Sequence, residues 1–275
     1  MNLLANAEGL AKVLAGGTDL LVQMRSKMVH PGLIVDIKKI PDVHSITVES
    51  DGRIRVGAAV SGAELGEHPE VIKAYPGVVE AVELIGSTQI QGRASPGGNL
   101  CNASPAADSV PAMIAAGAVC TVAGPDGTRE VAAEDIATGP GQTSLAKGEF
   151  VVDFVLPART EHSADAYLRM IPRTEMDIAI VGAGVDLTLD GDGTITAARV
   201  SLGAVAPTVL LVEEAGAAIV GSKLDDAALE KLDAAARAAC NPIDDKRGTV
   251  AYRTKVAGVL ARRAAAIAYE RARSK

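Results

Sequence analysis

The pattern of apolar and polar positions predicts a small unit of strands and helices at the start of the chain. Leu20, Leu21 and Met24 recur at helical spacing, and Thr18 stands where an N-cap is expected. The expected elements are a short helix running into a strand over residues 3–14, a helix after Thr18, a strand over 33–37 and a hairpin that turns at Asp51-Gly52. Together they predict a first α+β lobe that ends near residue 56.

A second part follows this lobe. A helical pattern over residues 71–84 gives way to a long loop over residues 86–104, and loops of this length inside a compact domain are more often functional than not. Pro105 is expected to open a further helix, which Pro111 kinks or divides. The remaining expected elements are a hairpin over residues 118–131 and a strand that ends at Pro157.

The pattern changes again after Arg159. Three strand-like runs follow, the last two joined by a turn at residues 190–193, and helices are expected over residues 225–239 and 249–272. The chain is therefore predicted to be an α+β protein of two domains. The predicted boundaries are a first domain at residues 1–160, with sublobes of about 1–56 and 57–160, and a second domain, an antiparallel sheet with helices, at residues 161–275.

Composition and charge narrow the range of functions. The 275 residues include 34 acidic and 27 basic side chains, and the net charge of −7 disfavours nucleic-acid binding. Aromatic residues make up 2%, too few for a surface that stacks bases, whereas 48% are hydrophobic, enough for one or two cores. The sequence has neither an apolar run of about 18 residues nor a signal-peptide pattern, so we expect a cytoplasmic protein without a transmembrane segment.

The cysteines and histidines are scattered along the chain. None of their spacings matches a CxxC pair or a short cluster of metal ligands. The residues concerned are Cys101, Cys120, Cys240, His30, His44, His68 and His162. We therefore expect no zinc or iron–sulfur site in this chain, and no metal ligands.

Two glycine pairs are candidates for binding phosphate. Gly16-Gly17 follows an expected strand and precedes an expected helix, and Gly97-Gly98 lies inside the long loop. Glycine lets backbone N–H groups approach an anion closely, and a following helix N-terminus adds a favourable partial charge. Two such loops can hold the two phosphates of a dinucleotide. A tight turn is the simpler interpretation of either pair taken alone.

Other nucleotide-binding signatures are missing. The sequence contains no P-loop pattern. Gly182 and Gly184 resemble the start of a dinucleotide fingerprint, but Leu187 stands where its third glycine belongs. We therefore expect a strand of small residues there and no Rossmann domain.

Two segments carry a resemblance to a known family: LAGGTDLL at residues 14–21 and IQGRASPGGNLCNASPAADSVPAMIAAGA at residues 90–118. In this order they resemble the FAD-binding medium subunit of molybdenum hydroxylases, the group that includes aerobic carbon monoxide dehydrogenase and xanthine dehydrogenase. The resemblance continues through GPGQTSLAKGEFV, RMIPRTEMDIAIV and AYRTKVAGVLARRAA and covers essentially the whole chain. It implies a two-lobed FAD-binding domain of the vanillyl-alcohol-oxidase (PCMH) type, followed by a small α+β domain with a three-stranded antiparallel sheet and helices.

The resemblance also implies a set of FAD-binding residues, while it implies no catalytic residue. In the family, the two glycine loops embrace the FAD pyrophosphate. Asp108 matches a position by the adenosine end, where a carboxylate can accept hydrogen bonds from ribose hydroxyls. Ile85 and Val151 match apolar positions close to the flavin, and Arg169 matches a basic position near the cofactor. The full implied set is Leu14, Ala15, Gly16, Gly17, Thr18, Asp19, Leu20, Ile85, Ser95, Gly97, Gly98, Asn99, Asp108, Val151 and Arg169.

Two features depart from the family pattern. Where the family has an Arg-Asn-Arg run and a Thr-Ile pair, this sequence has Gln91-Gly92-Arg93 and Ser95-Pro96. Because proline has no N–H, we expect one backbone contact to phosphate fewer. The sequence also starts inside what is normally the family's first helix, without an opening strand.

The function implied by the resemblance is electron transfer. In such complexes FAD receives electrons from 2Fe-2S clusters in a small iron–sulfur subunit and passes them to an external acceptor, while the substrate is oxidised at a molybdopterin site in a large subunit. These two subunits are the implied partners, in a dimer of heterotrimers. The substrate (carbon monoxide, a purine, an N-heterocycle or an aldehyde) and the electron acceptor stay open.

Two alternatives are a stand-alone flavin oxidase or reductase of the same fold, and a non-enzymatic protein that kept the scaffold but lost FAD. A stand-alone enzyme would need its own catalytic acid or base, and the sequence suggests none. Neither glycine loop offers a histidine or cysteine next to the expected flavin face. We therefore expect FAD to be bound without a covalent link.

Overall fold

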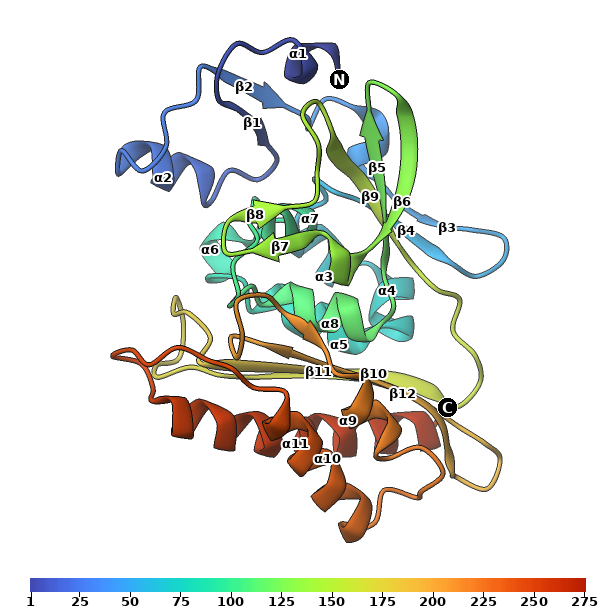
Figure 1. Ribbon diagram of the computed structural model, residues 1–275. Helices are drawn as coiled ribbons and strands as arrows, with labels where there is room; N and C mark the ends of the chain where they lie inside the picture. Colours follow the sequence, from blue (N-terminus) through green and yellow to red (C-terminus); the bar gives the residue numbers. More distant parts are fainter.

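The structure, a computed structural model, describes all of residues 1–275 (Figure 1). Its N-terminal lobe is built on a two-stranded parallel sheet. The elements of the lobe are α1 (Asn2–Ala5), β1 (Ala11–Leu14), α2 (Leu20–Arg25) and β2 (Leu33–Asp36). Helix α2 begins after Asp19, whose side chain makes no capping hydrogen bond. The prediction that Thr18 caps this helix is therefore wrong, and the first turn of α2 is left without a side-chain cap.

A five-stranded sheet in the order β3-β4-β9-β5-β6 forms the second lobe. Its strands are β3 (Ile46–Val48), β4 (Ile54–Gly57), β5 (Val119–Gly124), β6 (Gly127–Ala132) and β9 (Phe150–Leu156). The hairpin β3–β4, expected in the first lobe, belongs to this sheet, because β4 pairs antiparallel with β9 and Ile54 lies opposite Leu156. The first lobe thus ends before residue 46, near the 3-10 turn η1 (Pro41–His44), and not near residue 56. The hairpin pattern is local and carries no information about a partner strand so much later in the chain.

Six helices connect β4 to β5. They are α3 (Gly62–Gly66), α4 (Pro69–Ala74), α5 (Pro76–Glu83), α6 (Thr88–Gln91), α7 (Pro96–Cys101) and α8 (Ser109–Ala115). The helix predicted over residues 71–84 is two helices, because Pro76 has no N–H with which to continue α4 and instead opens α5. This helical layer lies between the second lobe and the C-terminal sheet (Figure 1).

The segment predicted to be a structureless loop contains α6 and α7. Ser95 is the N-cap of α7, and its hydroxyl accepts a hydrogen bond from Gly98 N–H at 3.1 Å. Pro105 does not open the next helix; α8 begins at Ser109, and Pro111 lies in its first turn, where proline is tolerated. The chain between β6 and β9 carries the 3-10 turn η2 (Ala133–Asp135) and a small hairpin, β7 (Ala137–Gly139) and β8 (Gln142–Thr143).

The C-terminal domain is a sheet in the order β10-β11-β12-β13 with helices on one face. Its elements are β10 (Ser163–Met170), β11 (Val181–Leu189), β12 (Ile195–Gly203), β13 (Leu210–Leu211), α9 (Glu213–Ala217), α10 (Asp226–Ala238) and α11 (Val250–Arg273). The three long antiparallel strands and the helices α10 and α11 lie as predicted, while the two-residue strand β13 was not predicted. Helix α11 covers one face of the sheet, and α5 and α8 cover the other (Figure 1).

Close packing joins the C-terminal sheet to the helical layer. At Gly184 a Cβ atom would lie 2.5 Å from the carbonyl oxygen of Pro111 in α8, so only glycine allows this approach. The strand of small residues expected around Gly184 is thus confirmed as β11, and its glycine serves helix packing.

Arg159 forms ion pairs with Asp165 and Asp186, which lie opposite each other on β10 and β11.

Candidate functional site

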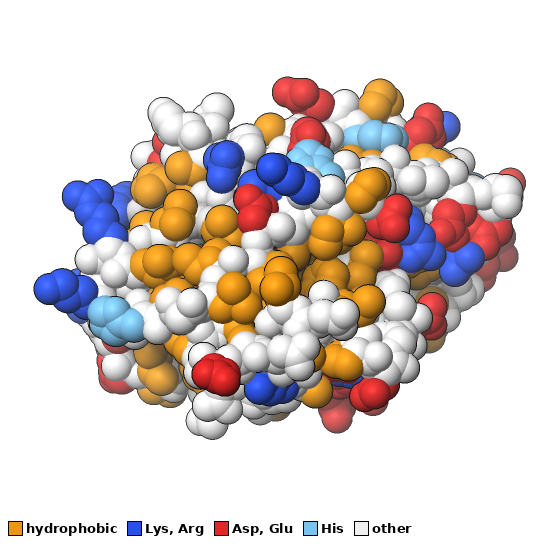
Figure 2. Space-filling view, turned by 90° about the horizontal axis from the view of Figure 1, so that it is seen from above, with side chains coloured by type: hydrophobic (Ala, Val, Ile, Leu, Met, Phe, Trp, Pro, Cys, Tyr) orange, Lys and Arg blue, Asp and Glu red, His pale blue; other side chains and the backbone are white.

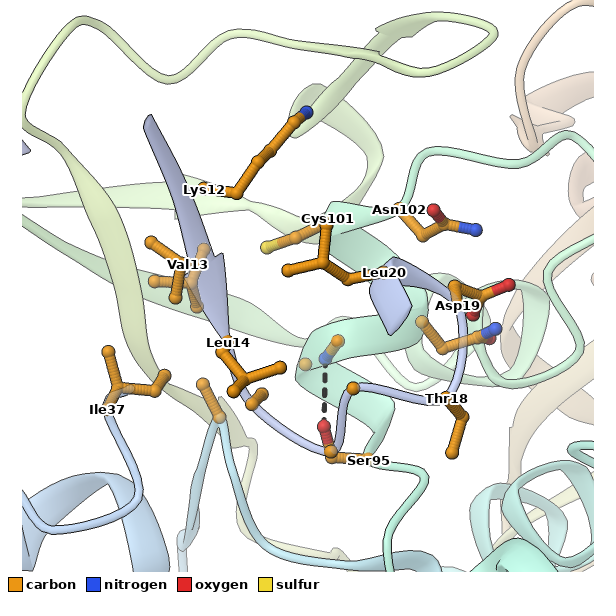
Figure 3. A pocket seen from close by; sticks show the side chains of 18 of the residues that line it. Lys12, Val13, Leu14, Thr18, Asp19, Leu20, Ile37, Ser95, Cys101 and Asn102 are labelled. Atoms are coloured by element: carbon orange, nitrogen blue, oxygen red, sulfur yellow. Dashed lines mark hydrogen bonds between the residues drawn. The ribbon is translucent and has the colours of Figure 1, made fainter. Parts of the chain in front are cut away.

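A groove runs between the N-terminal lobe and the second lobe (Figure 3). It holds about 940 Å³ of space, open solvent included, and 24 residues line it. Its walls are the end of β1, the loop that leads into α2, helix α7 and strand β9. A second hollow, between the first ten residues and the segment before β9, adjoins it and shares Lys12, Val13, Cys101, Leu145 and Glu149.

Thirteen of the fifteen residues predicted from the sequence meet in this groove. The set comes from segments far apart in the chain, and the two glycine loops lie at its centre. The residues are Leu14, Ala15, Gly16, Gly17, Thr18, Asp19, Leu20, Ile85, Ser95, Gly97, Gly98, Asn99 and Val151. The structure therefore brings the two loops together as one surface.

The first loop offers a row of free hydrogen-bond donors. The backbone N–H groups of residues 16–20 donate to no acceptor within the chain. The carbonyl oxygen of Ala15 accepts from Lys38 Nζ at 2.9 Å, and that of Gly16 faces Arg93 Nε at 3.4 Å. Because C=O and N–H point in opposite directions across a trans peptide, these contacts orient the following N–H groups away from Lys38 and Arg93. Such a row of N–H groups is suited to an anion.

Each glycine of the first loop is required for a different structural reason. At Gly16 a Cβ would lie 1.7 Å from the carbonyl oxygen of Arg93, so the N-terminal lobe touches the helical layer backbone to backbone there. Gly17 has φ +81°, a left-handed conformation that favours glycine. Both glycines are thus needed to build the loop itself.

In the second loop, Gly97 serves packing and Gly98 faces the groove. A Cβ at Gly97 would lie 2.5 Å from the carbonyl oxygen of Ala58, whereas at Gly98 the nearest atom is the Ser95 hydroxyl, at 2.9 Å. The Gly97 N–H donates to no acceptor within the chain. Asn99 Oδ1 accepts hydrogen bonds from Ser109 at the start of α8, at 3.1 Å from its N–H and 2.8 Å from its hydroxyl.

Asp108 and Arg169 lie outside the groove lining, in contact with each other. Arg169 Nη1 is 2.8 Å from Asp108 Oδ2 and also donates to the carbonyl oxygen of Leu84, next to Ile85. The Tyr167 hydroxyl donates to Asp108 Oδ1 at 3.4 Å. Burial raises the pKa of Asp108 to about 6, although the Arg169 charge opposes this shift. The pair joins β10 to α8 and to the end of α5.

Eleven lining residues were missed by the sequence reasoning. They are Lys12, Val13, Gln23, Ile37, Ala58, Ala94, Cys101, Asn102, Leu145, Glu149 and Phe150. Ala94, Cys101 and Asn102 belong to the segment of residues 90–118 that carries the resemblance, so the motif could have found them, whereas the other eight lie outside both motifs and carry no such signal. Gln23 and Asn102 form a hydrogen bond of 3.2 Å between α2 and the end of α7, a contact that only the folded chain reveals.

One cysteine, Cys101, belongs to the groove lining. It lies at the end of α7 and lines the groove (Figure 3). Burial raises the pKa of its thiol to about 12. Because the thiolate is the nucleophile, a thiol that stays protonated at neutral pH is poorly suited to form a covalent link.

The face of the molecule above the lobe is apolar. Figure 2 shows hydrophobic side chains gathered across the middle of this face, with charged groups towards its edges. Exposed apolar residues of the lobe are Met1, Leu3, Leu10, Leu21, Val22, Met28, Ile34 and Ile40. None of the helices is both long and apolar enough to span a membrane. No group of three or more His, Cys, Asp and Glu side chains is placed to hold a metal ion.

Comparison with known proteins assigns the family. Residues 1–159 match the FAD-binding domain in molybdopterin dehydrogenase, and residues 166–268 match the CO dehydrogenase flavoprotein C-terminal domain. The chain belongs to this family. Its members are oxidoreductase subunits with FAD as cofactor, and the resemblance drawn from the sequence is confirmed.

Relatives of the chain are similar over most of their length. The carbon monoxide dehydrogenase medium chain of Afipia carboxidovorans is 35% identical over 264 residues, covering 96% of this chain and 91% of the relative. A putative xanthine dehydrogenase FAD-binding subunit of Escherichia coli is 34% identical over 216 residues, 78% of this chain and 73% of the relative. The solved structure of reconstituted CO dehydrogenase from Oligotropha carboxidovorans matches with a TM-score of 0.93 at 35% identity, covering 98% of this chain and 93% of that one. The two-part fold predicted from the resemblance is thus confirmed.

Proposed function

We propose that this family member is the FAD-binding electron-transfer subunit of a molybdenum hydroxylase complex, with FAD held in the groove between the lobes. The free N–H groups of residues 16–20 carry the proposal, because a row of unpaired backbone donors at a groove is a site for an anion. The Gly97 N–H adds a donor from the second loop. Together they suit the pyrophosphate of FAD, and Pro96 removes one further donor.

The remaining lining suits the rest of the cofactor. Leu14, Ile85 and Val151 offer apolar surface for a flavin ring, and the Asp108–Arg169 pair fixes the segment that carries Ile85. FAD, when bound, exchanges electrons one or two at a time and so connects one-electron to two-electron partners. The chain's own contribution is to bind and orient the cofactor. The protonated thiol of Cys101 favours noncovalent binding.

The electron-transfer role is favoured over a stand-alone oxidase by the composition of the groove. Its lining contains no histidine and no tyrosine. The Glu149 carboxylate is paired with Arg129, which lowers its pKa to about 2, so it is a weak base. We therefore place substrate oxidation on a large molybdopterin subunit and the supply of electrons on a small iron–sulfur subunit, in a cytoplasmic complex of two heterotrimers. The relatives' designations as medium chain and FAD-binding subunit support this division.

The test uses the full chain, alone and with its two proposed partner subunits. The purified chain should be yellow, and acid precipitation should release all of its flavin into the supernatant. Carbon monoxide, xanthine, N-heterocycles and aldehydes should leave the flavin of the isolated chain oxidised in stopped-flow absorbance. Adding the partner subunits should allow reduction by the complex's own substrate. Rapid bleaching of the flavin in the isolated chain would instead establish the stand-alone oxidase.

A further inference from the structure

The turn that carries Ile85 is held on both sides by the C-terminal domain. Ile85 lines the groove and directly follows Leu84, the C-cap residue of helix α5. Arg169 on β10 donates from Nη1 to the carbonyl oxygen of Leu84 at 2.8 Å. The backbone N–H of Met176, in the segment between β10 and β11, donates to the carbonyl oxygen of Gly86 at 3.3 Å. The carbonyl groups of both neighbours of Ile85 are therefore hydrogen-bonded to another domain.

Arg169 is well suited to hold this turn in one place. Its side chain is 5% exposed, and the Nη1 that meets Leu84 also lies 2.8 Å from Asp108 Oδ2. The guanidinium group is planar and rigid, so a partner that fixes it also fixes the direction of its remaining N–H bonds. A helix end leaves carbonyl groups without a partner, and a positive charge is favourable there. Arg169 thus brings a donor and a charge to the end of α5, and Asp108 keeps it there.

Ile85 belongs both to the core and to the groove. It is one of the cluster of 30 buried hydrophobic residues, and it also lines the groove. Its own N–H stays within the end of α5 and donates to the Val82 carbonyl oxygen at 3.1 Å. A displacement of the turn therefore moves an apolar part of the groove wall, which in the proposed function lies against the flavin ring.

We propose that Arg169 is a positioning residue for the flavin: by holding the Leu84 carbonyl group it fixes Ile85 against the ring. The C-terminal domain then sets the environment of a cofactor that is bound between the other two lobes. This inference rests on the proposed function. Arg169 lies outside the groove lining and its charge is paired with Asp108, so it acts through Ile85 and not by direct attraction of the diphosphate.

The experiment is a double-mutant cycle in the full-length chain, with Arg169→Lys, Ile85→Ala and the two combined. Arg169→Lys keeps a charge beside Asp108 but loses the rigid fork that meets two partners at once. Each apoprotein is titrated with FAD by flavin fluorescence, and the visible circular dichroism of the bound flavin is recorded. Thermal unfolding of each apoprotein checks folding. Arg169→Met combined with Asp108→Asn replaces Arg169→Lys if that variant does not fold, because it leaves no unpaired buried charge.

Arg199→Lys is the matched control. Arg199 on β12 also joins the C-terminal sheet to the helical layer, since it donates to the carbonyl oxygen of Ile114 at 2.9 Å and pairs with Glu134 at 2.9 Å. It lies outside the groove lining. Its substitution loosens the same joint between domains without touching the turn that carries Ile85.

Arg169→Lys should weaken FAD binding by about 3- to 10-fold, the size of the coupling between residues in contact. It should also change the visible circular dichroism of the flavin. In the Ile85→Ala background the same substitution should change the affinity by less than about twofold, because the side chain through which Arg169 acts is gone. Arg199→Lys should leave the affinity and the spectrum unchanged.

Three results would overturn the role of Arg169 while leaving the proposed function intact. One is wild-type affinity and spectrum in Arg169→Lys. Another is an equal loss of affinity with and without the Ile85 side chain, which means that Arg169 does not act through it. The third is a loss of the same size in Arg199→Lys, which points to a general loosening of the joint. Failure of the wild-type chain itself to bind FAD would overturn the proposed function, and this inference with it.

Discussion

The N-terminal lobe and the C-terminal domain are held together by very different amounts of buried apolar surface. The lobe shares a cluster of six buried hydrophobic residues with the neighbouring sheet, and none of the residues of α2 is buried. The C-terminal domain has a cluster of 26 buried residues, packed against the 24-residue helix α11. Because apolar burial is the dominant favourable term in folding, the lobe should open at a much lower free energy than the C-terminal domain.

The two walls of the groove also differ in how much buried apolar surface supports them. The wall with the free N–H groups belongs to the weakly packed lobe, and the opposite wall, with α7 and β9, belongs to a cluster of 30 buried residues. A ligand that binds only the closed arrangement stabilises it by mass action. We therefore expect the proposed cofactor to order the lobe, while the C-terminal domain stays folded with or without it.

The largest effect should come from the C-terminal core. Leu202 is fully buried in β12, so Leu202→Ala should lower the free energy of unfolding by about 2–5 kcal/mol. Leu21 in α2 is 52% exposed, and Leu21→Ala should change it by less than about 0.5 kcal/mol. Urea unfolding followed by circular dichroism measures both. Equal losses would show that the two regions are packed alike and would break the comparison.

Next in size is the contact between the N-terminal lobe and the helical layer. Gly16→Ala places a Cβ 1.7 Å from the Arg93 carbonyl oxygen and so forces the two apart. It should weaken FAD binding more than about 100-fold, or about 2.7 kcal/mol, with little change in C-terminal stability. Gly92→Ala is the control, because a Cβ there meets nothing within 4 Å. Unchanged FAD affinity in Gly16→Ala would contradict the proposed site.

A smaller effect is expected on local opening. With FAD at about 100 times its Kd, the mass-action stabilisation is about 2.7 kcal/mol, which limits the change in exchange rate to about 100-fold. Hydrogen exchange should therefore slow by about 10- to 100-fold in α2 and the loop before it, and stay constant in β11 and α11. Similar protection of all these elements by FAD would mean that the lobe and the C-terminal domain open as one unit.

The smallest predicted effect concerns the joint between the helical layer and the C-terminal sheet. Burial raises the pKa of Asp186 to about 7, against about 3.9 for an unperturbed aspartate. The folded state thus holds this proton more tightly, so the stability that the group contributes is lost as pH rises from about 4 to about 7. Asp186→Asn removes that dependence. The free energy of unfolding of the variant minus that of the wild type should therefore be larger at pH 8 than at pH 5, by about 1 kcal/mol once the Arg159 contact has relaxed. A constant difference in urea titrations at the two pH values would show that Asp186 is not the titrating group.

Much of the fold was predictable because its signals are local. The alternation in β3–β4 and β5–β6, the apolar run of β9 and the helical spacing in α10 and α11 each reflect the period of a single element. The exceptions are of two kinds. Pro76 divides a helix, and Ser95 and Pro96 start one inside an apparent loop, so these two concern where a helix begins. The pairing of β4 with β9 joins strands that are far apart in the chain.

The candidate site was predictable only where it carries a motif. The two glycine loops were found, whereas Lys12 and Gln23 were not, since nothing in the neighbouring sequence marks a residue that becomes part of a groove by tertiary packing. The resemblance implied Asp108 and Arg169 as residues near the cofactor, and the fold places them in contact with each other.

The sequence by itself determined the family, the order of the longer strands and helices and the presence of two glycine loops, because periodicity and short motifs are properties of neighbouring residues. The tertiary structure alone decided what each glycine does. Gly16 and Gly97 are glycines because backbone from another segment lies where their Cβ atoms would be, and Lys38 and Arg93 hold the carbonyl oxygens of Ala15 and Gly16, so that the next two N–H groups point away from them. Such contacts join residues distant in the chain, so they exist only once the lobes have packed.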